Sequence, residues 1–339
     1  MARQATALFL ALLTTAGAAQ RTAGPELSGS LTPVHDPAII RQGDEFLLFV
    51  TGHLGPGPGP LALRTSPDLV HWTLRGASFP ELPSWAARLV PGAKGLWAPD
   101  ISRVGGEYRL YYAVSTFGSN RSAIGLATAR KIDPEHPAAG WTDKGPVIAS
   151  TPTNDYNAID PAAFVDVDGR HWMAFGSFWS GIKLIELDPK TGLRKAGDPA
   201  PRAIAARPEL GQQPGPGPGA LEAPFVIRRG GYYYLFVSFD FCCRGKESSY
   251  NTVVGRARTP EGPYVDRTGR AMLRGGGTPV LASGRGGGDR FVGRGHVAVL
   301  QDGGRDRIVY HAYDTQANGT PTLRIQPLKW TRDGWPVAA

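Results

Sequence analysis

Cysteine is nearly absent from this chain, and the little that is present cannot hold distant segments together. The only two cysteines among the 339 residues are neighbours, Cys242 and Cys243. Adjacent cysteines cannot crosslink remote parts of a fold, and no second, spaced Cys/His pair completes a zinc site. Two states stay open for the pair: a vicinal disulfide in an oxidising compartment, or two thiols at the end of a strand.

Long apolar runs and long helical patterns are missing as well. No segment reaches the length that a transmembrane helix needs, which excludes a helical membrane protein. Apolar residues recur with helical spacing for about one turn only, around Trp85 to Leu89. Short aromatic or alternating runs between turn residues dominate instead, in a chain with 45 glycines and 30 prolines. The sequence therefore predicts an all-β fold.

A concentrated charge of one sign is the third missing feature. The 37 Lys and Arg residues exceed the 29 Asp and Glu residues, giving a net charge of +8, but the basic residues are scattered along the chain. Without a basic stripe, nucleic acid is excluded as a partner. We expect a soluble monomer.

The N-terminus has the layout of a secretory signal peptide. Arg3 precedes an uncharged run over residues 5–13, and small residues follow up to Ala19. The apolar run is too short to span a bilayer. We therefore predict that residues 1–19 are a signal peptide, cleaved after Ala18 or Ala19, and that the mature protein is secreted to the exterior or the periplasm.

An acid beside Ala, Ile or Pro recurs at the start of an apolar run about every sixty residues. The segments are His35-Asp36-Pro37, Ala98-Pro99-Asp100, Ile159-Asp160-Pro161 and Glu222-Ala223-Pro224, followed by Gly293-Arg294-Gly295-His296 with a histidine in the place of the acid. A glycine turn and an aromatic-rich strand follow each segment. The predicted strands are 46–50, 108–114, 171–178, 232–239 and 307–313.

This repeat predicts one domain over residues 28–339, a five-bladed β-propeller with four-stranded blades around a central axis. The Pro/Gly tracts at 55–60 and 214–219 and the Gly-rich tracts at 275–277 and 284–288 are predicted to be loops, because they cannot join a sheet. Radial repetition brings equivalent positions to the same end of the axis. The acids should therefore meet around one pocket.

Converging carboxyl groups repel one another unless they perform chemistry or bind a cation. A single Asp-Pro pair is ordinarily a turn former. Here the acids recur in phase, and one of them is Glu222, a poorer turn former with a longer reach. Hydrolysis of a glycosidic bond uses such a set: one acid protonates the leaving oxygen, a carboxylate activates water on the opposite face, and a third acid raises the pKa of the proton donor.

At these residues the sequence resembles glycoside hydrolase family 43, and within it the endo-1,5-α-L-arabinanases. The resemblance covers nearly the whole chain after the predicted signal peptide. Together, the matching stretches are far more specific than any one of them. They are residues 35–37, 95–101, 115–120, 123–127, 157–161, 176–182, 221–224, 238–245 and 330–336.

The family folds as a five-bladed propeller and hydrolyses with inversion of configuration. The resemblance implies that Asp36 is the general base, Glu222 the general acid, and Asp160 the residue that tunes the pKa of Glu222 and orients it. Base and acid of an inverting enzyme stand roughly 6.5–9.5 Å apart. The predicted substrate-binding residues are His35, Trp97, Phe117, Gly118, Asn157, Ser177, Phe178 and Trp179.

The resemblance also implies a metal ion near the axis, often calcium, held mainly through water with help from His296. No organic cofactor is expected. This chain departs from the family motif, because Arg294 stands where the family usually has Pro, and Val297 and Ala298 replace polar residues after the histidine. An arginine so close to the site would oppose a cation.

The implied activity is cleavage of internal α-1,5-arabinofuranosidic bonds in arabinan, a side chain of pectin. The positive net charge is compatible with an anionic polymer such as pectin. Two alternatives stay open: an exo-acting α-L-arabinofuranosidase or β-xylosidase on the same fold, and a propeller that only binds carbohydrate. The complete set of Asp36, Asp160 and Glu222 argues against the second. For Asp100, an anchoring role at a loop or strand start is preferred to a catalytic one.

Overall fold

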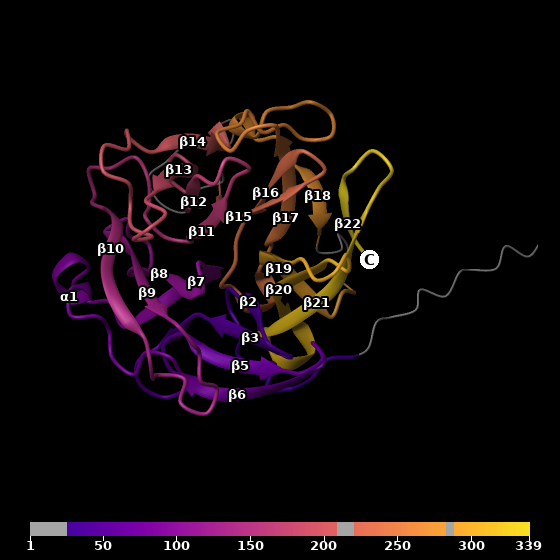
Figure 1. The fold of residues 1–339 in the computed structure, drawn as a ribbon. Helices are drawn as coiled ribbons and strands as arrows, with labels where there is room; N and C mark the ends of the chain where they lie inside the picture. The colour runs from indigo at the N-terminus through magenta and orange to yellow at the C-terminus, as the bar shows by residue number, and fades with distance from the viewer. Residues whose placement is uncertain (1–25, 209–219, 283–287) are drawn as a thin grey trace, which may run out of the picture.

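Five β-sheets surround a central axis in the computed structural model of the chain (Figure 1). The structure describes residues 26–208, 220–282 and 288–339. The predicted signal peptide, the Pro/Gly tract at 214–219 and most of the Gly-rich tract at 284–288 lie outside these residues. Strands predominate, and the prediction of an all-β, five-bladed propeller is confirmed. Within the described residues, no helix is long and apolar enough to cross a membrane.

The elements follow one another as a series of meanders. Blade 1 contains β1 (Ser28–Gly29), β2 (Ala38–Gln42), β3 (Glu45–Val50), β5 (Ala62–Ser66) and β6 (His71–Ala77). Blade 2 contains β4 (Gly52–His53), β7 (Gly95–Val104), β8 (Glu107–Val114), β9 (Ser122–Ala129) and β10 (Thr142–Ser150), with α1 (Ala86–Leu89) before β7. Blade 3 contains β11 (Ala162–Val165), β12 (His171–Phe175), β13 (Ile182–Leu187) and β14 (Arg202–Ala205).

The last two blades carry the three described 3₁₀ turns. Blade 4 contains β15 (Leu221–Arg229), β16 (Tyr232–Phe239), β17 (Asn251–Ala257) and β18 (Thr278–Leu281), with the 3₁₀ turns η2 (Gly245–Glu247) and η3 (Met272–Arg274). Blade 5 contains β19 (Phe291–Leu300), β20 (Arg307–Asp314), β21 (Thr320–Trp330) and β22 (Pro336–Ala338), with η4 (Thr315–Ala317).

Both faces of the central strands are buried, because each blade packs against two neighbours. In β16, Leu235 and Val237 face a cluster shared with blade 3, whereas Tyr234 and Phe236 face a cluster shared with blade 5. This is the period of two that a strand imposes on its side chains. The described residues contain five such apolar clusters, one for each pair of adjacent blades.

Four of the five predicted aromatic-rich strands lie within a residue or so of their expected bounds, and one is shorter. The strand predicted over 171–178 ends at Phe175. Its continuation is broken because Gly176, Phe178 and Trp179 have positive φ angles of 132°, 53° and 40°, which no extended strand contains. The chain therefore turns out of blade 3 towards the axis at these residues.

A left-handed residue stands at the axial end of every blade. Its φ angle is 52° at Asp36, 40° at Ala98, 56° at Asp160, 56° at Ala223 and 50° at His296. This conformation is costly for residues other than glycine, so its recurrence marks a constraint of the fold. It also corrects the predicted equivalence of the acids. Asp36, Asp160 and His296 occupy the shared position, whereas Glu222 lies one residue before it and Asp100 two residues after it.

Five hydrogen bonds link these axial segments into a ring, each from a backbone N–H to a side chain of the preceding blade. We call this set the axial ring. The donor and acceptor pairs are Ala98 to Thr51 Oγ1 (2.7 Å), Ala163 to Asp100 Oδ2 (2.8 Å), Ala223 to Asp160 Oδ2 (3.1 Å), His296 to Ser238 Oγ (2.9 Å) and Asp36 to His311 Nδ1 (3.1 Å). Asp100 therefore has the anchoring role that the sequence analysis preferred.

The innermost strands repeat this closure. Each innermost strand contacts the innermost strand of the next blade, in the order β2, β7, β11, β15 and β19, and β19 contacts β2 again (Figure 1). Among the described strands no sheet combines the two ends of the chain, so blades 1 and 5 meet without a shared strand. Besides the bond from Asp36 to His311, their junction contains backbone bonds from Val34 to Pro321 and from Leu323 to Leu31, together with an apolar cluster that includes Val34 and Leu323.

We predict that the junction between blades 1 and 5 is sensitive to a cavity. Leu323 is fully buried there, so Leu323→Ala should lower the free energy of unfolding by about 2–5 kcal/mol in urea denaturation. Leu54→Ala is the matched control, because Leu54 is 43% exposed and should change stability by about 0.5 kcal/mol or less. Equal effects of the two substitutions would contradict this account of the closure.

Candidate active site

A cavity of about 470 Å³ opens at the axial ends of the blades. All of the residues that the sequence analysis predicted as catalytic, substrate-binding or metal-binding line it. They are His35, Asp36, Trp97, Phe117, Gly118, Asn157, Asp160, Ser177, Phe178, Trp179, Glu222 and His296. They come from blades 1 to 5, so only the closed ring brings them together. Asp100 is the exception among the recurring acids, because it is buried in the axial ring rather than in the cavity wall.

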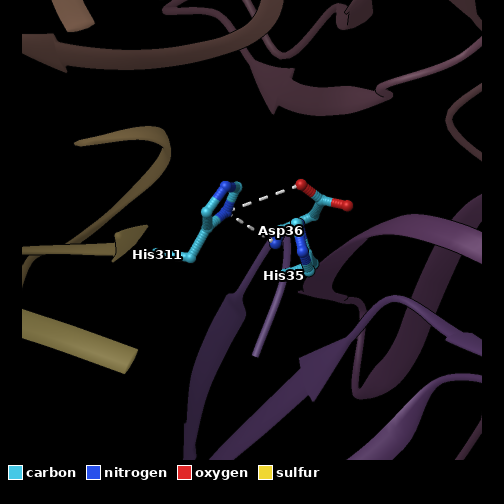
Figure 2. A group of neighbouring side chains, drawn as sticks. All are labelled: His35, Asp36 and His311. Atoms are coloured by element: carbon cyan, nitrogen blue, oxygen red, sulfur yellow. Dashed lines mark hydrogen bonds and ion pairs between the residues drawn. The ribbon is translucent and has the colours of Figure 1, made fainter. Parts of the chain in front are cut away.

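Asp36 is an ionised carboxylate surrounded by donors. Its Oδ2 accepts a hydrogen bond from Thr51 Oγ1 at 2.5 Å, and its Oδ1 lies 2.9 Å from Nδ1 of His296. Figure 2 shows His311 of the adjacent blade 5 facing Asp36, and Nδ1 of His311 lies 3.7 Å from Oδ1 of Asp36. Burial alone would raise the pKa of Asp36, but the charge and hydrogen bond of His296 outweigh it and hold the pKa well below its usual range.

Glu222 is held at both carboxyl oxygens. Ser177 Oγ lies 2.5 Å from Oε2, and Tyr250 OH donates to Oε1 at 2.6 Å. Glu222 is only 7% exposed. Burial raises its pKa, although these two hydrogen bonds and His296 oppose the rise. The pKa values of Asp36 and Glu222 are therefore displaced in opposite directions within one cavity, which is how two carboxyl groups can divide the roles of base and acid.

Asp160 and Asp100 are the most buried acids near the axis, each 6% exposed. Burial raises the pKa of Asp160, and repulsion from Glu222 and Asp36 adds to this against the opposing charge of His296. Asp160 Oδ2 accepts the N–H of Ala223, the residue after Glu222, so it fixes the backbone that carries Glu222. Burial also raises the pKa of Asp100, to about 7.

His296 provides the positive charge among these acids. Burial opposes its protonation, but Asp36, and after it Asp160 and Glu222, raise the pKa of His296 to about 9. His35 and His311, the two other histidines beside Asp36, behave differently, because burial lowers the pKa of both. A neutral His311 can accept the Asp36 N–H at Nδ1. Without the imidazolium of His296, the carboxylate of Asp36 would be an uncompensated buried charge.

The walls of the cavity combine aromatic faces with a few polar atoms. Trp97 donates through Nε1 to Nε2 of His53 at 3.2 Å, and Phe117 is 81% exposed at the rim. The Oδ1 of Asn157 is buried and accepts no hydrogen bond from the described residues. A buried acceptor without a donor is costly unless a ligand supplies one. The wall therefore has the apolar faces and the sparse polar groups of a small-molecule or sugar site.

Comparison with known proteins identifies the chain's relatives. The model of glycosyl hydrolases family 43 matches residues 31–336. The chain belongs to this family. It is therefore a glycoside hydrolase.

Two curated relatives of this family 43 chain differ in their mode of action. It is 45% identical over 304 residues to an extracellular endo-α-(1→5)-L-arabinanase of Bacillus subtilis, covering 89% of this chain and 87% of the relative. It is 42% identical over 308 residues to an extracellular exo-α-(1→5)-L-arabinofuranosidase of Cellvibrio japonicus, covering 89% and 85%. Among solved structures, the α-L-arabinanase of Cellvibrio cellulosa in complex with arabinohexaose superposes with a TM-score of 0.83 at 40% identity, over 91% of this chain and 96% of that one.

The donor atoms at the axis fit a hydrated ion better than a calcium bound directly by protein. Ligand atoms of His35, Asp36 and His311 lie within 4.8 Å of one another, but only one of the three residues offers oxygen, and calcium takes six to eight oxygen ligands. The Nδ1 of His296 is already bonded to Asp36. The expected opposition from Arg294 is not found, because its guanidinium pairs with Asp289 and with backbone carbonyls outside the cavity.

Several residues of the site were missed by sequence reasoning. Tyr250 and His311 follow no recurring motif. Tyr250 reaches Glu222 from another segment of blade 4, and His311 reaches Asp36 only once blades 5 and 1 have packed. Thr51 directly follows β3, the aromatic-rich strand of the first repeat. Its place in the repeat could have indicated a residue of the site. The cysteine pair, for which two states were open, is a vicinal disulfide, and Cys242 and Cys243 both line the cavity.

We predict that Asp100 makes stability depend on pH. Because its pKa is about 7 in the fold and near 3.9 in an unfolded chain, folding takes up a proton between these values. Stability from this group is therefore present at low pH and lost as the pH rises from about 4 to about 7. Asp100→Asn should remove this loss. In urea unfolding, the free energy of unfolding of the variant should therefore rise relative to that of the wild type between about pH 4 and pH 7, by about 4 kcal/mol at most. The low-pH end is the internal control, and parallel curves would contradict the assignment.

Proposed function

We propose that this enzyme is a secreted, monomeric endo-1,5-α-L-arabinanase that cleaves arabinan by a single displacement with inversion. Arabinan as the substrate class is supported by the curated relatives and by the arabinohexaose complex of a structure that covers 91% of this chain. Secretion is supported by relatives that are named extracellular. The observation that carries the proposal is the opposite displacement of two pKa values in one cavity, lowered at Asp36 and raised at Glu222.

Asp36 is the general base in this mechanism. Its carboxylate accepts hydrogen bonds from Thr51 and His296, which hold it ionised and fix its orientation. In this state it takes a proton from a water molecule on one face of the arabinosyl ring, and the water attacks the anomeric carbon. His296 keeps a positive charge beside Asp36, so the carboxylate remains available at neutral pH.

Glu222 is the general acid. Burial raises the pKa of Glu222 and so favours its protonated form, and in that form its proton passes to the glycosidic oxygen as the bond to the anomeric carbon breaks. Tyr250 and Ser177 orient the carboxyl group. Asp160 acts on Glu222 in two ways, through its bond to the N–H of Ala223 and through the repulsion between two carboxyl groups.

The substrate-binding residues extend the cavity on either side of these carboxyl groups. Trp97, Phe117, Phe178 and Trp179 offer flat faces to the sugar rings, and His35, Gly118, Asn157 and Ser177 stand between them. The unpaired Oδ1 of Asn157 fits a substrate hydroxyl as its donor.

We predict that Asp36→Asn and Glu222→Gln each fold and each lower kcat on linear arabinan by about 10³-fold or more. An aryl arabinoside separates their roles, because its leaving group needs little protonation: the loss in Glu222→Gln should shrink on this substrate, and the loss in Asp36→Asn should persist. Glu261→Gln, which changes a carboxyl group outside the cavity lining, is the control. Retained activity of either catalytic variant on linear arabinan would falsify the assignment.

Product analysis separates internal cleavage from the exo-acting alternative, which the Cellvibrio relative favours. An endo-acting enzyme should release a mixture of oligomers from linear arabinan early in the reaction and lower its viscosity. Monosaccharide or one short oligomer from the first time point would replace the proposal with an exo-acting enzyme. Absence of reducing-sugar release from arabinans and xylans would leave only a carbohydrate-binding propeller.

We include calcium in the proposal as an ion that keeps most of its water, beside His35, Asp36, His296 and His311. When bound, it would supply a positive charge near the base and order the water around it. EDTA treatment should then lower kcat/KM and the thermal midpoint, and calcium should restore both. An enzyme that is free of calcium by elemental analysis and keeps its full activity would remove the ion from the proposal.

A further inference from the structure

The vicinal disulfide lies in the wall of the active-site cavity. Cys242 and Cys243 are bonded to each other and line the cavity together with Phe241. They belong to the loop between β16 and β17 of blade 4, the sheet that also carries Glu222 on β15. Cys243 is exposed. The proposed mechanism uses none of these three residues.

The first part of this loop, residues 240–243, is fixed at both ends. At its start, Asp240 has a φ angle of 68° and accepts hydrogen bonds from Arg207 and Asn251, each at 2.8 Å. At its end, Cys243 has a φ angle of 64°, and its N–H donates to the hydroxyl of Tyr313 on β20 at 2.7 Å. The loop therefore presents the disulfide from a position that blades 4 and 5 hold together, which is what a preorganised binding surface requires.

This surface is formed by two aromatic rings and the disulfide, with one guanidinium over a ring. Phe178 and Phe241 lie with ring centroids 6.1 Å apart, and the guanidinium of Arg244 lies 3.9 Å from the centroid of Phe241. A disulfide has no N–H or O–H donor, and its sulfur atoms are polarisable, so it suits the less hydroxylated face of a sugar ring. We call Phe178, Phe241, Cys242 and Cys243 the disulfide platform.

A short chain of contacts ties the platform to the general acid. Tyr250 donates its N–H to the carbonyl of Phe241 and its hydroxyl to Oε1 of Glu222. Trp97, by contrast, lies on β7 of blade 2 and bonds to His53 on β4 of the same sheet. The platform therefore lies on the side of the acid, which protonates the oxygen of the departing sugar.

We propose that the disulfide platform binds the arabinosyl residue that departs with the leaving group. This inference rests on the proposed function, because it takes the substrate and the role of Glu222 from it. The intact disulfide is needed for it: a dithiol reductant delivers two electrons and two protons, is itself oxidised to a disulfide, and leaves two thiols that are free to turn apart. Cleavage of arabinan should then depend on an oxidising environment.

The test compares two substrates that share the sugars on the base side. Linear arabinohexaose places arabinosyl residues on the leaving-group side, whereas α-1,5-arabinotriosyl fluoride departs as fluoride and occupies no site there. The double variant Cys242→Ala/Cys243→Ala should lower kcat/KM for arabinohexaose about tenfold, the size expected for one lost ring-stacking contact. Turnover of the fluoride by the double variant should stay within about twofold of that by the wild type, because a twofold change corresponds to less free energy than the loss of one ordinary contact.

Reduction provides the matched control. A dithiol reductant should reproduce the arabinohexaose defect in the wild type and have no effect on the double variant, while circular dichroism and the thermal midpoint report the fold. Equal losses on both substrates would overturn the platform, because the disulfide would then act through the fold or through Tyr313. An unchanged double variant would overturn it as well. A wild type that leaves arabinan uncut would overturn the proposed function itself.

Discussion

The hydrogen bond from an axial backbone N–H to a side chain of the preceding blade is the interaction on which the rest of this structure depends. Five such bonds form the axial ring, and the blades meet at the junction of the chain ends without a shared strand. The left-handed backbone at Asp36, Asp160 and His296 is part of the same arrangement. The ring thus uses functional side chains as structural ones: Asp160 closes a junction between blades and acts on Glu222.

The second constraint is electrostatic. Asp36, Asp160 and Glu222 line one cavity, and their burial strengthens the repulsion between like charges. The chain balances them with one protonated histidine, His296, and with raised pKa values at Asp160 and Glu222. Asp36 and Glu222 are thereby distinguished by their surroundings rather than by residue type, because the imidazolium bonds directly to Asp36 and not to Glu222.

Much of this arrangement could be predicted from the sequence. The sixty-residue recurrence, the glycine turns and the apolar alternation determine five meanders, because short strands with both faces apolar must pack against neighbours on both sides. The predicted site residues all line one cavity, although their roles were implied by family resemblance. The strand predicted over 171–178 is three residues too long, because a pattern of side chains does not reveal a left-handed backbone at Phe178 and Trp179.

The sequence alone determined the fold class, the blade count and the convergence of carboxyl groups from several blades, since these follow from local periodicity repeated along the chain. It did not reveal that Asp100 stays outside the cavity wall. Only the tertiary structure decided how those groups differ. His296 pairs with Asp36, and Asp100 accepts the N–H of Ala163, across at least 63 residues of sequence. Tyr250 bonds to Glu222 between two segments of one blade. A pKa depends on distance and burial, and neither exists until the ring has closed.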